Sequence, residues 1–287
     1  AIEFFKHLNS VIRGRKDGAI IIAEESTAWP NVTKSPEEDG LGFTFKWNMG
    51  WMHDFLEYMK LDPYFRKFNH NKMTFGITYC TSENFILVLS HDEVVHLKCS
   101  MINKMPGEYE DKFANLKVGY TFMLGHPGKK LLFMGQDFGQ FHEWDEKVSL
   151  DWYLTKEPFH ADLQNYVKGL LTLYHKYPAL YRLDEEYDGF QWINANDGDR
   201  SIFSFIRRDE TQKKNLLFIC NFTPVDRDDY RVGVPKRGTY TLLLDQEHGY
   251  YKRGDKISRS IKSECDGQPY SFAYPLPAYG TAVFRFS

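Results

Sequence analysis

The sequence predicts an α/β unit built on a parallel sheet or barrel, followed by an all-β unit. Up to about Leu183, near-continuous apolar runs alternate with segments of helical periodicity. Beyond that residue, short runs rich in aromatic and β-branched side chains are separated by turn residues, a pattern typical of an antiparallel sandwich. We therefore expect one domain over residues 1–183 and a second over residues 184–287.

The first unit contains strand-like and helix-like runs in alternation. We expect strands over residues 18–26, 41–47, 83–93 and 129–138. We expect helices over residues 1–12, 48–62, 111–129 and 162–178, the third of which is stopped by the sequence Gly-His-Pro-Gly. Repeated strand–helix units imply a parallel sheet that is covered on both faces.

The second unit contains six runs of four to eight residues with strand composition. They lie at residues 189–193, 201–208, 215–222, 239–244, 270–276 and 281–286. The polar stretch Asp209–Asn215 joins two of them as a hairpin loop. An antiparallel β-sandwich of roughly 100 residues follows.

Composition excludes several classes of partner and site. The net charge is −3 and the pI is about 6.4, so nothing favours nucleic acid or an anionic membrane. No apolar run approaches the roughly 18 residues of a membrane span. The four cysteines are scattered, which argues against zinc and against a disulfide framework and indicates a reducing cytoplasm. We expect no metal and no cofactor.

Acidic residues stand where three of the four expected strands end. They are Glu24-Glu25, His91-Asp92-Glu93 and Asp137. Chemistry in parallel α/β barrels sits at the C-terminal ends of the strands. Glu24 and Asp92 are separated by two strand–helix units, so they should lie on strands with one neighbour between them and point into one cleft.

Each of these residues also has a purely structural interpretation. Glu24 and Glu25 fit surface acids at the start of a loop equally well. Ser90 and Glu93 match a capping box, in which two side chains satisfy backbone N–H groups of a following helix. A single histidine such as His91 is more often structural than a ligand. Asp137 precedes Phe-Gly and fits a turn.

Carboxylates in one cleft suit the chemistry of glycosidic bonds. A general acid must protonate the leaving oxygen, and negative charge favours the cationic transition state. No Ser-His-Asp order, P-loop, dinucleotide fingerprint or HExxH motif is present, so competing chemistries lack support.

Four longer stretches resemble a known family. AEESTAWP, KWNMGWMHDFLEYMKLDP, ENFILVLSHDEVVH and GHPGKKLLFMGQDFGQFHEW are similar to the bacterial type of 1,4-α-glucan branching enzyme, in the α-amylase superfamily. The resemblance extends over essentially the whole chain. The HDE triplet alone is typical of the superfamily, whereas KWNMGWMHD and SHDEVVH are more specific. Two departures are Leu97, where glycine often follows VVH, and Asp137, where glutamate is common.

The resemblance implies a role for three residues. Glu24 matches the general acid/base after the fifth strand of a (β/α)8 TIM barrel, Asp92 matches the transition-state stabiliser after the seventh, and His91 beside it contacts substrate. The family's nucleophile, an aspartate after the fourth strand, has no counterpart in this sequence. We therefore expect a C-terminal portion: barrel strands five to eight and the β-sandwich, without the N-terminal half of the barrel.

The substrate implied by the resemblance is an α-1,4-glucan such as glycogen, and the reaction transfers a chain to a 6-hydroxyl. Without the nucleophile, we expect the 287 residues alone to be inactive. Two alternatives remain. One is a glucan hydrolase of the same superfamily, which would use water as the acceptor. The other is a non-catalytic glucan-binding module that uses the sandwich, which would leave Glu24 and Asp92 unexplained.

Overall fold

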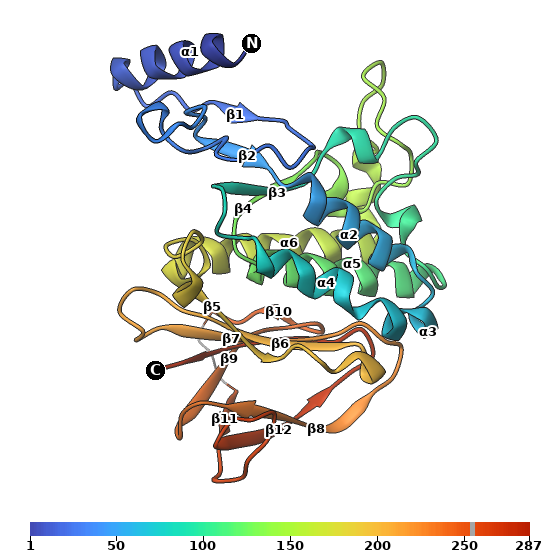
Figure 1. The fold of residues 1–287 in the computed structure, drawn as a ribbon. Coiled ribbons are helices and arrows are strands. Elements are labelled where there is room, and N and C mark those ends of the chain that lie inside the picture. Colours follow the sequence, from blue (N-terminus) through green and yellow to red (C-terminus); the bar gives the residue numbers. More distant parts are fainter. Residues whose placement is uncertain (253–255) are drawn as a thin grey trace.

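The computed structural model describes residues 1–252 and 256–287, and it is layered (Figure 1). A four-stranded sheet lies at one side, helices pack beneath it, and two further sheets follow. The N-terminus lies beside the first sheet and the C-terminus beside the sandwich. The layers place the predicted strand ends on one side of the molecule and the all-β unit on the other.

The first sheet is parallel, and its strands follow one another in chain order. Its members are β1 (Ile22–Ala23), β2 (Phe45–Trp47), β3 (Phe85–Leu89) and β4 (Lys129–Leu132). All three pairings between neighbours are parallel. β3 is buried along its whole length because it is flanked on both sides and covered by helices, as expected for a strand inside a parallel sheet.

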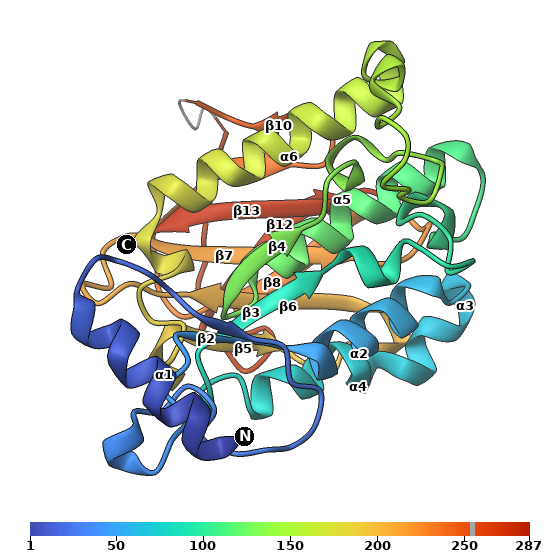
Figure 2. The ribbon, with the colours of Figure 1, turned by 90° about the horizontal axis from the view of Figure 1, so that it is seen from above.

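The helices form the layer beneath this sheet, except for the first. They are α1 (Ile2–Arg15), α2 (Met49–Lys60), α3 (Pro63–Arg66), α4 (His70–Phe75), α5 (Tyr109–Gly125) and α6 (Pro158–Lys176). Figure 2 shows α1 and α6 at opposite margins of the molecule. α1 docks by Phe5 against Phe43, with ring centroids 5.5 Å apart, and by a 2.8 Å hydrogen bond from Asn9 to the Leu41 carbonyl.

The all-β unit consists of two antiparallel sheets. Their strands are β5 (Phe190–Asn194), β6 (Ile202–Arg207), β7 (Asn215–Asn221), β8 (Arg227–Val234), β9 (Thr239–Asp245), β10 (Gly249–Tyr250), β11 (Ile257–Arg259), β12 (Tyr270–Leu276) and β13 (Thr281–Phe286). The larger sheet runs β10-β9-β13-β7-β6-β5, with β11 also pairing with β9, and the smaller is β12-β8. β6 and β7 form the predicted hairpin. The predicted sandwich is present, and β8 is a strand that sequence analysis missed.

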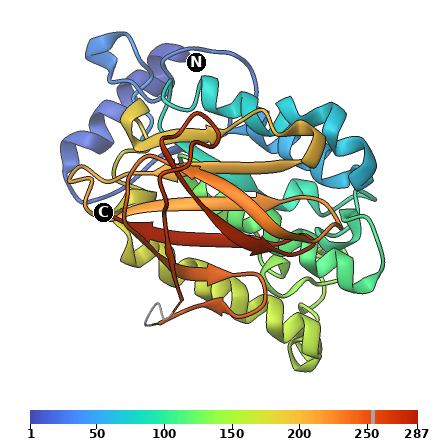
Figure 3. The same cartoon turned by 90° about the horizontal axis from the view of Figure 1, so that it is seen from below.

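Two large hydrophobic cores hold the layers together. The first joins α2, α5 and α6 to β3 on one side and to the larger antiparallel sheet on the other. The second lies between the two antiparallel sheets. Figure 3, seen from below, shows the strands of the all-β unit spread across the helices. The expected boundary between residues 183 and 184 stays a prediction, because the first core includes residues from both sides of it.

Arg66 ties the helical layer to the all-β unit. Its guanidinium is fully buried and donates 2.8 Å hydrogen bonds to the carbonyls of Met59 and Phe222. It also lies over the rings of Tyr58 and Phe222, at 5.5 and 5.9 Å from their centroids. These two hydrogen bonds and the aromatic faces offset the cost of burying the cation, although Nε of Arg66 is buried without a hydrogen-bond partner among the described residues.

The first strand is much shorter than the sequence predicts. The expected strand over residues 18–26 is reduced to Ile22–Ala23, and Ile20 and Ile22 are 59% and 40% exposed. β1 is the edge strand of the described sheet, with β2 as its partner. An apolar run that was predicted to be interior therefore has solvent on one side.

None of the helices in the described part of the chain combines the length and the apolar character needed to cross a membrane.

Candidate active site

The parallel sheet brings the predicted acidic residues to one edge. Glu24 follows β1 directly, and His91 and Asp92 lie two and three residues after the end of β3. β2 lies between these two strands, as the spacing predicts. Because the strands are parallel, their C-terminal ends face the same side, which is where α/β folds bind ligands.

Glu24 and Glu25 differ in their surroundings. Glu24 is exposed, and no side-chain hydrogen bond or ion pair involves it among the described residues. Glu25 accepts hydrogen bonds from Lys46 Nζ at 2.8 Å and from the Thr27 N–H at 2.7 Å. Burial raises the pKa of Glu25, but these hydrogen bonds lower it by more, so its pKa lies below the usual range. Glu25 is thus an ionised structural partner of Lys46, while Glu24 is free to meet a ligand.

His91 and Asp92 form a pair beside the end of β4. They lie in a 3₁₀ turn, His91–Glu93, with His91 Nε2 3.1 Å from Asp92 Oδ1. Their side chains are 45% and 41% exposed, so both can reach a ligand. The His91 ring is supported by Phe133 and Trp144, at centroid distances of 5.8 and 6.1 Å.

The capping-box interpretation of Ser90 and Glu93 is wrong. The segment after β3 is a short 3₁₀ turn, and no side chain caps it. The Ser90 hydroxyl is buried without a hydrogen-bond partner among the described residues, and Glu93 instead faces Lys98 at 3.5 Å. Ser90 and Glu93 therefore do not satisfy the backbone N–H groups at the start of a helix.

Asp137 is not brought to the strand-end site. It lies in a 3₁₀ turn, Gln136–Phe138, between Gly135 and Gly139, which both have positive φ angles of 86° and 68°. Its carboxylate accepts a 3.1 Å hydrogen bond from Gln164 on α6. The turn interpretation of this residue fits the geometry.

Aromatic side chains line a cavity of about 510 Å³ beside the ends of β1 and β2. Its aromatic residues are Trp29, Trp47, Phe75, Tyr79 and Phe85. The Glu25–Lys46 pair also contributes to the wall, as does Asp54, whose pKa burial raises. Flat rings next to charged hydrogen-bonding groups suit a ligand with apolar faces and hydroxyl edges. Sequence analysis missed these residues, although the rings within AEESTAWP and KWNMGW were a signal.

Metal binding has no evident site in residues 1–252 and 256–287. No group of three or more His, Cys, Asp or Glu side chains in these ranges is arranged to hold a metal ion.

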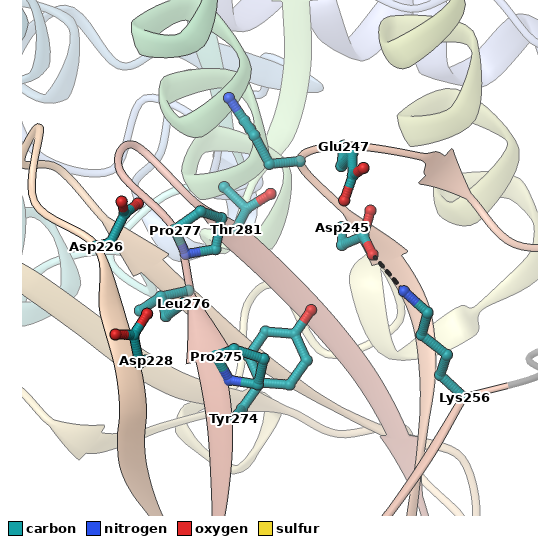
Figure 4. A pocket seen from close by; sticks show the side chains of 11 residues that line it. Asp226, Asp228, Asp245, Glu247, Lys256, Tyr274, Pro275, Leu276, Pro277 and Thr281 are labelled. Carbon is teal, nitrogen blue, oxygen red and sulfur yellow. Dashed lines mark ion pairs between the residues drawn. The ribbon is translucent and has the colours of Figure 1, made fainter.

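A second cavity, of about 250 Å³, lies in the all-β unit (Figure 4). Asp226 and Asp228 stand on one side of it, and Asp245 and Glu247 on the other, with Lys256 3.8 Å from Asp245. Tyr274 is the single aromatic residue among the described residues that line it. One ring offers a small stacking surface, so this cavity gives little support to a glucan-binding module that uses the sandwich alone.

Sequence comparison decides the family. The chain is 59% identical over 291 residues to the 1,4-α-glucan branching enzyme GlgB of Butyrivibrio fibrisolvens. The match covers 100% of this chain and 45% of that protein. The Gloeobacter violaceus branching enzyme GlgB is 48% identical, with 99% of this chain and 39% of that protein covered. The chain belongs to the family of the 1,4-α-glucan branching enzymes. It spans less than half the length of these relatives.

Two further comparisons concern the fold. The family model "Alpha amylase, C-terminal all-beta domain" matches residues 192–287. Type I pullulanase from Bacillus subtilis in complex with maltose has a TM-score of 0.71 at 15% identity, covering 100% of this chain and 42% of that one. An α-amylase from H. orenii has a TM-score of 0.64, also at 15% identity, over 100% of this chain and 57% of that one. These structures show a shared amylase-type fold.

Leu97 stands where the resemblance leads us to expect glycine, and its backbone conformation is one that favours glycine. Its φ is 66°, in the left-handed region, which glycine adopts without strain and a branched side chain does not. The SHDEVVH motif therefore ends in a turn that this chain forms with leucine.

Proposed function

We propose that these 287 residues form part of a branching enzyme that cuts an α-1,4-glucan and transfers the released chain to a 6-hydroxyl. Membership in the family supports the reaction class. The observation on which the proposal rests is the placement of Glu24 and Asp92 after alternate strands of one parallel sheet, with His91 beside Asp92. A branch in an α-glucan such as glycogen is the product.

In this proposal, β1 to β4 are the last four strands of a (β/α)8 barrel. Their parallel pairing in chain order and the covering helices support this. The remaining strands would pair with the free edges of β1 and β4. The nucleophilic carboxylate would come from that other half, because the resemblance places it after the fourth barrel strand and β1 is the fifth in this proposal.

The proposed mechanism retains the configuration of the sugar. The carboxylic acid of Glu24 protonates the oxygen of the α-1,4 bond while the nucleophile attacks the anomeric carbon, which gives a glycosyl–enzyme ester. The Glu24 carboxylate then removes the proton from a 6-hydroxyl, and that oxygen displaces the nucleophile. Both proton transfers involve the same oxygen atoms, so Glu24 returns to its starting form.

Asp92 and His91 act on the charge of the transition state. An ionised Asp92 favours the cationic sugar ring, and its 3.1 Å contact with His91 fixes its orientation. The aromatic cavity beside β1 and β2 supplies stacking faces for neighbouring glucose units.

The four cysteines are free thiols, which supports the expected location in a reducing cytoplasm.

The test uses full-length branching enzyme containing these residues, with amylose as substrate. Glu24→Gln or Asp92→Asn should lower kcat by about 10³-fold or more, because each removes a group that acts in the transition state. Amylose binding should survive in both. Glu110→Gln, an exposed acid in the first turn of α5, is the matched control. Near wild-type branching by either variant would refute the assigned role.

The same assay separates the branching enzyme from the hydrolase alternative. Branch transfer lowers iodine staining without a matching rise in reducing ends, whereas hydrolysis raises reducing ends in proportion. The amylase and pullulanase structures share the fold, so they leave this distinction to the assay. The isolated 287 residues should do neither, since they lack a nucleophile.

A further inference from the structure

The loop after the His91–Asp92 pair has an unusual backbone. His96, Leu97 and Cys99 have φ angles of 57°, 66° and 69°, three left-handed residues within four positions. None is glycine, and only glycine, and to a lesser degree asparagine or aspartate, adopts this region readily. Such strain persists only where surrounding contacts impose it, and it concentrates at functional sites.

Glu143 provides the contact that imposes this conformation. Its Oε2 accepts a hydrogen bond from the Leu97 N–H at 3.0 Å, and its Oε1 accepts one from the Cys99 N–H at 2.7 Å. Hydrogen bonds to an ionised acceptor are stronger than those between neutral groups. The next residue, Trp144, donates its N–H to the Val94 carbonyl at 2.9 Å. One short segment thus fixes both ends of the loop Val94–Cys99.

The loop lies beside the candidate active site. Val94 is two residues after Asp92, and the Trp144 ring that follows Glu143 contacts His91 edge-on at 6.1 Å. The Leu97 side chain is 95% exposed. It therefore contributes nothing to the core, although its position demands a strained backbone. An exposed apolar side chain on the loop that follows the His91–Asp92 pair is suited to contact a ligand.

We propose that Leu97 is a specificity-determining contact for the glucan and that Glu143 is the positioning residue that holds it there. This inference rests on the proposed function, because it deepens the same site. Leu97 packs against the apolar C–H face of a glucose unit close to Asp92. Since this contact is made in both the ground state and the transition state, it affects substrate binding and chain selection more than the chemical step.

The first experiment changes the side chain and keeps the backbone. In the full-length enzyme, Leu97→Asn retains a residue that tolerates the left-handed region but removes the apolar surface. The KM for amylose should rise about three- to tenfold while kcat stays within about twofold, as expected for the loss of one apolar contact. The length distribution of the transferred chains should shift. Leu97→Met, which stays apolar, should restore most of the binding.

The second experiment tests the role of Glu143. Glu143→Gln retains an acceptor but loses the charge and one of the two hydrogen bonds, so KM should rise as in Leu97→Asn. Glu146→Gln, an exposed acid of the same segment, is the control. In a Leu97→Gly background the backbone strain is relieved, so Glu143→Gln should change KM less than it does with leucine present. A merely structural glutamate would lower the thermal midpoint without this dependence on residue 97.

Two outcomes would overturn the inference. One is that Leu97→Asn leaves both KM and the transferred chain lengths at wild-type values. The other is that Glu143→Gln and Glu146→Gln behave alike. Failure of the proposed function is a separate result, because the wild-type full-length enzyme would then form no branches at all.

Discussion

Arg207 Nη2 donates a 2.7 Å hydrogen bond to Asp184 Oδ1, and both side chains are buried. The pair lies where the chain passes from the helical layer to the all-β unit. Arg207 also donates to the carbonyls of Gly125 and Gly189, and Lys129 Nζ lies 2.9 Å from Asp184 Oδ2. This cluster of charged side chains therefore links the helical layer to the all-β unit.

Removing the carboxylate should destabilise the protein strongly. Asp184→Asn leaves the buried Arg207 guanidinium without its counter-charge, which typically costs about 3–5 kcal/mol. Urea unfolding of the full-length enzyme at neutral pH would measure the change. Glu185→Gln, an exposed neighbour, is the control and should stay within about 0.5 kcal/mol of wild type. A loss below about 1 kcal/mol for Asp184→Asn would show that the pair contributes little.

Acid should destabilise the protein through two buried groups. The pKa of Asp184 is lowered to about 2: burial opposes this, but Arg207, Lys130 and Lys129 outweigh it. Its contribution is complete above its unfolded pKa near 3.8 and is lost as pH falls toward 2. Burial lowers the pKa of His126 from 6.5 to about 3, so the unfolded state takes up a proton first as pH falls below 6.5.

His126 should account for most of the loss of stability in the first part of an acid titration. Between pH 6.5 and about pH 4 the protein should lose roughly 3 kcal/mol of stability through His126. His126→Asn should flatten that part of the curve, while His175→Gln, an exposed histidine, should leave it unchanged. Denaturant midpoints measured across this range would check the slopes. An unaltered slope in His126→Asn would mean that other groups cause the acid sensitivity.

Gly125 should not accept a side chain. It ends α5, and an added Cβ would lie 2.6 Å from a Phe205 ring carbon and 3.0 Å from Phe218. Gly125→Ala should therefore lower stability by about 1–3 kcal/mol through overpacking. Gly14, in α1, has nothing within 4 Å of such a Cβ, so Gly14→Ala should be neutral or stabilising by up to about 1 kcal/mol. Thermal unfolding of both variants would test the contrast.

The isolated 287 residues should self-associate. β1 and β4 are the edge strands of the parallel sheet in the described part of the chain, and the exposed Ile20 and Ile22 lie at the first edge. At the second edge, apolar residues of α5, β4 and α6 line a cavity of about 400 Å³. Unpaired edges with apolar side chains template pairing between copies. Size-exclusion chromatography should show oligomers or aggregate, and a stable monomer would contradict the expectation.

Local patterns in the sequence predicted most of the helices and buried strands. α2, β3 and β4 lie within the expected segments, whereas α5 and α6 overlap theirs and begin two and four residues earlier. Apolar periodicity and the Gly-His-Pro-Gly stop are local signals, which is why these elements were found. β8 was missed because its first residues, Arg-Asp-Asp, are polar and only its second half is buried. β1 was overestimated because its apolar run gives no sign of how many neighbours the strand has.

The candidate site was predictable only in outline. The strand-end rule indicated that Glu24 and Asp92 share an edge, and the parallel sheet has that order. Contacts between segments that are distant in the chain could not be predicted from local patterns. Examples are the contact of Glu143 with Leu97 and that of Lys46 with Glu25. The catalytic assignment of Glu24, Asp92 and His91 stays a prediction until the variants are measured.

Helix α5 has a consequence for how this protein can change in evolution. Twelve of its 17 residues are buried, because β3 and β4 lie on one side and β7 and β13 on the other. A helix that covers a parallel sheet normally varies freely on its outward face, where water accepts almost any polar side chain. Here the sandwich occupies the place of water, so a substitution on the outward face of α5 must be matched by one in the sandwich. The two units are therefore expected to diverge in step and to tolerate exchange between relatives only as a pair.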